Sequence, residues 1–110
     1  MSLIELSQDD YGYTFTVTLF KSDDSATAEN LTNASSCSLD ITRLDETPIV
    51  NDATVTISDA ANGQVQFTPQ STWFTSDNIK DKRYFYAIFK INYSGGVKHS
   101  FKIPIYVHQH

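Results

Sequence analysis

Hydrophobic and polar residues alternate along much of this chain with the period of two that an extended strand has. Between residues 13 and 19, three threonines alternate with four large apolar residues, namely Tyr13, Phe15, Val17 and Leu19. Successive side chains of a strand point to opposite faces of a sheet, so this stretch has one apolar face and one threonine face. The pattern predicts a half-buried β-strand over residues 13–21.

The same alternation recurs in six further segments, and we expect strands over residues 2–7, 36–43, 54–58, 64–68, 83–93 and 97–107. The pair Asn62-Gly63 predicts a tight turn between the third and fourth of these, because both residues tolerate a positive φ. Pro104 cannot donate a hydrogen bond to a strand ladder, which predicts a sheet edge or a bulge at that position.

The segments between these strands show no helical period. Connections are expected over residues 22–33 and 45–52, and an irregular segment over residues 69–81, with a single helical turn around residues 72–74. About seven or eight short strands separated by turn signals are typical of an all-β sandwich. A chain of 110 residues has room for one such domain, spanning residues 1–110. Its core is expected to be one cluster between two sheets, formed by Phe15, Val17, Leu39, Ile41, Phe67, Phe89 and Phe101.

Composition and charge exclude several partners. The net charge is −5, and the basic residues are scattered apart from Lys80, Lys82 and Arg83. Nucleic acid and anionic membranes need clustered Lys and Arg, so neither is an expected partner. The chain does not open with the basic region and apolar core of a signal peptide, and no apolar run approaches the roughly 20 residues of a membrane helix. Synthesis in a cytoplasm is expected.

Residues that carry catalysis or bind metals are sparse. The chain has no Gly-x-Ser-x-Gly elbow and no phosphate-binding glycine loop, so we expect no enzyme activity, no catalytic residues and no cofactor. Cys37 alternates within a predicted strand and is expected to be a small buried hydrophobe. His108 and His110 have a spacing that would suit a transition metal, but solvated histidines at a frayed strand end are the preferred interpretation. Solvated turns are likewise preferred over calcium binding for the acidic pairs Asp9-Asp10, Asp23-Asp24 and Asp45-Glu46.

Aromatic residues outside the predicted core are the candidates for a binding surface. Trp73 and Phe74 lie in the irregular segment, where they would stack on a sugar, anchor a protein interface, or plug one open end of the sandwich. The plug is the preferred interpretation. Tyr84, Tyr86 and Ile88 alternate with core residues of the same strand, so they emerge on the other face of the sheet. A second apolar face indicates burial by a neighbouring subunit or a loop, and tyrosines lying flat on an exposed sheet are the alternative.

Three stretches, in order, carry a family resemblance: YTFTVTLFKSDDSATAENLTNASSCSLDI, VTISDAANGQVQFTP and YFYAIFKINYSGGVKHSFKIPIYV. They contain a leucine-threonine step at Leu31-Thr32 and an Ile-x-Val step at residues 105–107. Between these steps lie a Gly-x-Val-x-Phe strand at residues 63–67 and an Ala-x-Phe pair at residues 87–89. In this order the stretches resemble the immunoglobulin-like domains of tailed-phage virion proteins, and above all the N-terminal domain of siphophage upper baseplate proteins.

The resemblance implies an immunoglobulin-like β-sandwich of about seven or eight mostly antiparallel strands, located in the virion. It also implies a non-enzymatic structural protein that contacts the major capsid protein or tail and baseplate proteins. The family domain usually opens a longer polypeptide, whereas this chain stops at His110, so an accessory or decoration module is expected. Two features depart from the family pattern, namely Phe85 in place of a tyrosine and residues 22–25 in place of an Asp-Gly turn.

Two other classes of function stay open on the sequence. One is a carbohydrate-binding or host-adhesion module, with Trp73 and nearby tyrosines as stacking platforms for a glycan. The other is a small metal-binding protein or enzyme that uses His108 and His110. Association of the chain with copies of itself is a further expectation, since the second apolar face of residues 84–88 would be covered in that way.

Overall fold

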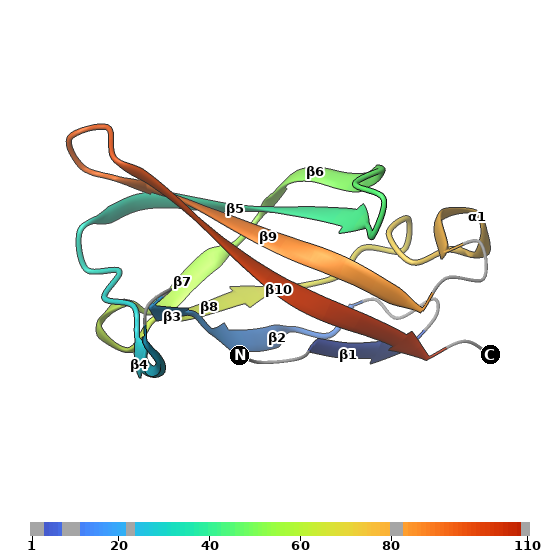
Figure 1. Ribbon diagram of the computed structural model, residues 1–110, viewed down its shortest axis with the longest axis horizontal. Coiled ribbons are helices and arrows are strands. Elements are labelled where there is room, and N and C mark those ends of the chain that lie inside the picture. The colour runs from blue at the N-terminus through green and yellow to red at the C-terminus, as the bar shows by residue number, and fades with distance from the viewer. Residues whose placement is uncertain (1–3, 8–11, 22–23, 80–82, 109–110) are drawn as a thin grey trace.

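Two β-sheets pack against each other in the computed structural model, which describes residues 4–7, 12–21, 24–79 and 83–108 (Figure 1). The larger sheet has five strands, in the order β1 (Ile4–Ser7), β10 (Lys98–His108), β9 (Tyr84–Tyr93), β5 (Ala34–Arg43) and β6 (Pro48–Thr54). The smaller sheet has three, in the order β2 (Phe15–Thr18), β8 (Gln64–Phe67) and β7 (Thr56–Asp59). The predicted all-β sandwich is confirmed.

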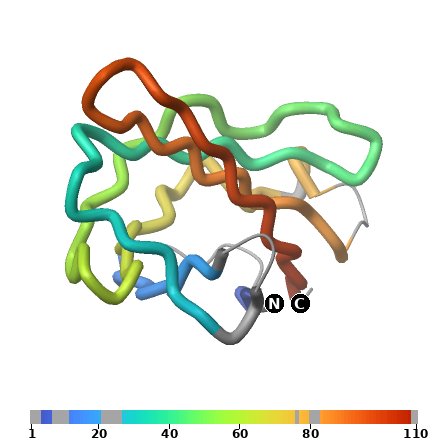
Figure 2. The backbone as a smooth tube through the Cα atoms, turned by 60° about the vertical axis from the view of Figure 1, so that its left-hand side comes forward, coloured from blue at the N-terminus to red at the C-terminus, as the bar shows by residue number. Residues whose placement is uncertain are grey.

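Three small elements complete the described part of the chain: a hairpin of β3 (Phe20–Lys21) with β4 (Asp24–Ala28), a 3-10 turn η1 (Ala60–Asn62) and a short helix α1 (Ser76–Ile79). The strand pairs are antiparallel except that β1 runs parallel to the end of β10. These two strands lie side by side in both views (Figures 1 and 2). β1 pairs only with residues 105–108 of β10. Pro104 lies just before this pairing begins, so on the side of β1 it is at an unpaired edge, where the missing N–H of a proline costs no hydrogen bond.

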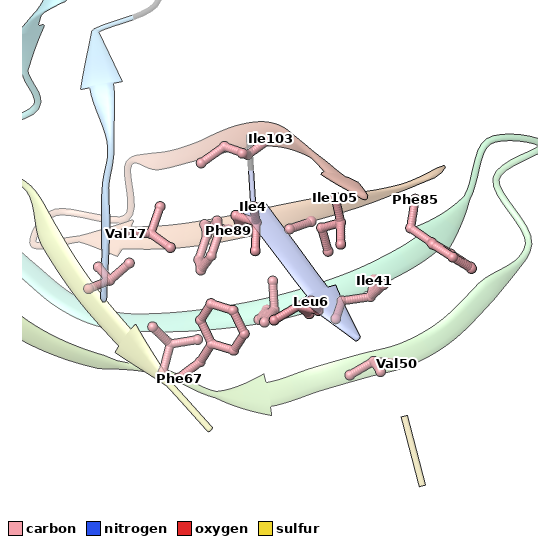
Figure 3. Packing of buried hydrophobic residues seen from close by; sticks show 14 of the residues in the cluster. Ile4, Leu6, Val17, Ile41, Val50, Phe67, Phe85, Phe89, Ile103 and Ile105 are labelled. Carbon is pink, nitrogen blue, oxygen red and sulfur yellow. The ribbon is translucent and has the colours of Figure 1, made fainter. Parts of the chain in front are cut away.

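The apolar faces of the two sheets meet in one core (Figure 3). Phe89, Ile41 and Ile105 of the larger sheet are fully buried, and they face Val17 and Phe67 of the smaller sheet. The residues predicted for the core are buried in this cluster, apart from Phe15 and Phe101, which are partly buried and pack against it. The alternation of the sequence therefore predicted the inward face of each long strand correctly.

Three of the predicted boundaries were wrong. The strand expected over residues 13–21 breaks at Leu19, whose N–H donates to the carbonyl of Gly63 and whose carbonyl accepts from the N–H of Glu29. The connection expected over residues 22–33 contains β4, which pairs with β3. The loop expected over residues 45–52 contains most of β6, which tolerates Pro48 because it is an edge strand and Pro48 is its first residue.

The irregular segment of residues 69–81 also differs in detail from the prediction. Its described part has a turn at residues 71–73, and its one helical turn is α1, a few residues later than the expected position. Asn78 and Thr75 define this later start, because the N–H of Asn78 donates to the Thr75 hydroxyl at 3.3 Å. A side-chain oxygen at that position satisfies one of the free N–H groups of the first turn.

Gly63 joins β7 to β8 and also fixes the neighbouring chain. The predicted hairpin forms, but through η1, and of the pair Asn62-Gly63 only Gly63 has a positive φ, of 67°. A Cβ atom on Gly63 would lie 2.6 Å from the carbonyl oxygen of Glu29 and 2.8 Å from that of Leu19. Only glycine combines the left-handed conformation with this close approach of backbone to backbone.

Replacement of Gly63 by alanine is therefore expected to destabilise the fold more than the same change at Gly96. Gly96 has φ 85° but no atom within 4 Å of the place that a Cβ would take, so Gly96→Ala adds the conformational strain alone. We expect Gly63→Ala to cost about 1–3 kcal/mol more than this control, because backbone must move to make room. Urea denaturation of both variants measures the difference, and equal losses would contradict the close approach.

Candidate functional site

The outer face of the larger sheet carries a row of aromatic and aliphatic side chains from two neighbouring strands. Phe85, Ala87 and Phe89 of β9 are buried, so the residues between them point outward, as predicted. The register of β9 with β10 places Tyr106 opposite Tyr84, Pro104 opposite Tyr86 and Lys102 opposite Ile88. We call these six residues the aromatic face: Tyr84, Tyr86, Ile88, Lys102, Pro104 and Tyr106.

Ring contacts hold the aromatic face in a defined arrangement. Tyr84 packs edge-on against Tyr106 with ring centroids 5.1 Å apart, and Tyr106 packs against His108 at 4.6 Å. The Arg83 guanidinium donates a hydrogen bond to the Tyr106 hydroxyl at 3.2 Å. Tyr84 remains 51% exposed, while Tyr86 and Ile88 are half-buried. Prepacked rings lose little side-chain entropy when a partner covers them, which favours binding.

Cationic groups line the same face. The Lys102 ammonium lies 4.1 Å from the centroid of the Tyr86 ring, a cation–π arrangement. Alternation along β10 turns Lys102, Pro104 and Tyr106 outward, but alternation alone does not show that they lie beside Tyr84 and Tyr86. The pairing of β9 with β10 produces that neighbourhood.

An ion-pair cluster borders the aromatic face. The Lys90 ammonium lies 3.0 Å from a carboxylate oxygen of Asp40 and 2.5 Å from one of Asp52. Asp40 also accepts a hydrogen bond from the Asp52 N–H at 2.8 Å, where Asp52 has φ 54°. The hydrogen bonds to Asp52 and Asp40 raise the pKa of Lys90. These charges are satisfied within the fold and tie the bend of β6 to the sheet.

Trp73 and Phe74 lie in the core, as the preferred interpretation as a plug predicted, and this corrects their listing among the candidate interface residues. Trp73 is 7% exposed and Phe74 is 1% exposed. The Asn78 amide donates to the carbonyls of Thr72 and Trp73, both at 2.8 Å, and Arg43 donates to the carbonyl of Asn78. These bonds hold the segment over the end of the sandwich as a plug. The open ring face that a sugar platform needs is therefore missing at Trp73.

The residues considered for metal binding are not brought together in the described part of the chain, where no group of three or more His, Cys, Asp or Glu side chains is close enough to hold an ion. His108 lies 3.5 Å from a Glu5 carboxylate oxygen. Hydrogen bonds from the Thr47 side chain and from the Thr47 N–H lower the pKa of Asp45. Four of the other residues considered, His110, Asp9, Asp10 and Asp23, lie outside the described residues, as do the basic residues Lys80 and Lys82.

Cys37 packs against the core as predicted, but it is partly buried and not fully buried. Burial raises its pKa to about 12. A thiol with so high a pKa is almost fully protonated at neutral pH, whereas nucleophilic cysteines need a lowered pKa.

The described residues include no helix that is long and apolar enough to cross a membrane.

Comparison with known proteins supports the fold class. The crystal structure of CopC from Methylosinus trichosporium OB3b aligns with 100% of this chain and 87% of that chain, with a TM-score of 0.55 and 8% sequence identity. At this identity the likeness shows the fold alone. Together with the sheet order it confirms the immunoglobulin-like β-sandwich. No protein-family model and no curated protein matches the sequence.

If Trp73 is a structural plug, its removal must lower stability. We expect Trp73→Ala to cost about 3–5 kcal/mol in the free energy of unfolding, because it leaves a cavity beside Phe67 and Phe74. Trp73→Phe, which keeps a ring, should cost clearly less. Denaturation followed by far-UV circular dichroism measures both, and an unchanged midpoint for Trp73→Ala would contradict the plug.

The raised pKa of Cys37 predicts slow alkylation of the folded protein. At pH 8 the folded thiol, with a pKa of about 12, holds a thiolate fraction about a thousandfold below that of an unfolded chain, and burial hinders access further. The rate with iodoacetamide, followed by mass spectrometry, should rise steeply with pH and should jump when urea is added. Equal rates for folded and unfolded protein would show that Cys37 is accessible.

Proposed function

We propose that this protein is a non-enzymatic structural module of a tailed-phage virion, an accessory or decoration protein that docks on capsid, tail or baseplate proteins. The aromatic face is the observation that carries the proposal. It presents three tyrosines, an isoleucine and a proline on a regular sheet, bordered by cationic groups. Tyrosine and arginine are enriched where proteins bury one another, and a hydrophobic centre with a polar rim is typical of such interfaces.

The rest of the fold supports a role in assembly. A rigid sandwich holds the aromatic face on β9 and β10, which pair with each other over most of their length. On a symmetric particle the same contact is repeated at every lattice site, and links between neighbouring copies would add avidity to a modest individual affinity. The resemblance of the sequence to virion domains supplies the choice of partner, namely another virion protein beneath the aromatic face.

A carbohydrate-binding or host-adhesion role is the second candidate. Trp73 does not support it as a stacking platform because the ring is buried. A different observation favours it, namely a groove on another side of the molecule that is lined by uncharged hydroxyl and amide groups. A metal-binding or enzymatic role has no specific observation in its favour among the described residues.

The aromatic face can be tested with Tyr86→Lys. We expect this variant to bind phage particles that lack the protein about 2–5 kcal/mol more weakly, because an extra ammonium would be buried without a partner and beside Lys102. The isolated fold should lose little stability, since Tyr86 is only half-buried. Particle binding by cosedimentation and thermal unfolding of the free protein measure the two effects.

Ser58→Lys is the matched control, because Ser58 is exposed on β7 of the other sheet and the variant adds the same charge there. It should bind particles like the parent protein. Full occupancy by Tyr86→Lys would place the docking surface elsewhere. The threonine face of residues 14–18 would then be the next candidate.

A further inference from the structure

The chain passes from β6 of the larger sheet directly into β7 of the smaller one (Figure 1). A groove lies along this side of the sandwich. It consists of two adjoining hollows of about 370 Å³ and 270 Å³. The hollows share Thr54, Thr68 and Gln70, so they lie next to each other, and we call the two together the neutral groove. Small-molecule sites occupy about 300–1,000 Å³, and the larger hollow falls in that range. The neutral groove contains none of the residues of the aromatic face.

The lining of the neutral groove is polar but uncharged. Its polar side chains are hydroxyls and amides, supplied mainly by Asn51, Thr54, Thr56, Gln66, Thr68 and Gln70. None of the described residues that line it is charged, although 19% of the chain is Asp, Glu, Lys or Arg. A charged ligand would lose its hydration here without gaining a counter-charge, so the lining selects a neutral one. The net charge of −5 disfavours anions further.

Several of these groups are free to bind. Within the described residues the side chains of Asn51, Thr54 and Thr56 have no hydrogen-bond partner. Other lining groups are already oriented, since the Thr14 and Thr68 hydroxyls lie 3.0 Å apart and the Gln70 amide donates to the Thr68 carbonyl at 2.8 Å. A ligand rich in hydroxyl groups would pair with both donors and acceptors of this set.

The groove also has apolar parts. Ile49, Ala53 and Trp73 contribute to its wall. A sugar ring presents C–H groups on its faces and hydroxyls around its edge, which matches apolar patches set among amides and hydroxyls. We propose that the neutral groove binds a neutral oligosaccharide.

An extended peptide added to the edge of β6 is the competing occupant, and the strand argues against it. Strand addition needs a regular row of free backbone groups. The pairing of β6 with β5 shifts register at two places, and Asp52, inside the strand, has a positive φ. Such an irregular edge is a poor template for another strand.

The test uses titration of the full chain with a panel of neutral oligosaccharides built from hexoses, deoxyhexoses and N-acetylhexosamines, at millimolar concentration. Trp73 is the only tryptophan and lies in the groove wall, so its fluorescence reports on this site. We expect saturable binding of at least one neutral member and no preference for sialylated or sulfated analogues. Asn51→Ala and Thr54→Ala should each weaken binding about three- to tenfold, because each removes one hydrogen bond to the ligand.

Asn33→Ala is the matched control, since Asn33 carries an exposed amide on a turn outside the neutral groove, and it should bind like the parent protein. Tyr86→Lys should also keep full sugar affinity, which separates this test from that of the aromatic face. The proposal is overturned if no neutral member binds, if acidic glycans bind better, or if the Asn51 and Thr54 variants bind unchanged. The proposal would also be overturned if an added peptide, and no sugar, protected the backbone amides of β6 from hydrogen exchange.

Discussion

A connected series of aromatic rings holds the sandwich together. Phe67 of β8 lies at its centre, stacked on Phe15 of β2 at 5.8 Å and on Trp73 at 6.3 Å, and tilted against Phe89 of β9 at 5.9 Å. The series continues through Phe74 to Phe85. Rings from both sheets and from the loop that closes one end of the sandwich therefore form one continuous series of contacts. Each ring buries a large apolar area, so both sheets and the plug depend on the same contacts.

The two outer surfaces of the sandwich differ in their chemistry. The larger sheet shows tyrosines, proline and cations, while the smaller sheet and its open side show threonines and amides. The first surface suits burial against protein, and the second suits hydrogen bonding to a neutral ligand. Docking to a particle through one surface would leave the other exposed. Binding of a protein on one surface is thus compatible with binding of a neutral ligand on the other.

Local irregularities matter as much as the regular strands. Leu19, Gly63 and Glu29 meet where the chain leaves β2, and their backbone hydrogen bonds tie η1 to the β3–β4 hairpin. At the other edge, Asp52 bends β6 and is tied to the sheet through Lys90 and Asp40. The first irregularity splits one predicted strand, and the second helps to shape the side on which the neutral groove lies. Irregularities of this kind change the direction in which the side chains of a strand point.

The sequence by itself determined the fold class, the inward face of each long strand and the outward position of Tyr84, Tyr86 and Ile88, because alternation with a period of two is a local property. It favoured the plug over the stacking platform for Trp73, which is buried, but it missed β4 and most of β6, which become strands only through pairing with a neighbour. Only the tertiary structure places Tyr106 beside Tyr84, and Thr54 in the same hollow as Gln70. Register and the crossing of β6 into β7 depend on contacts between residues distant in the chain, which no local pattern encodes.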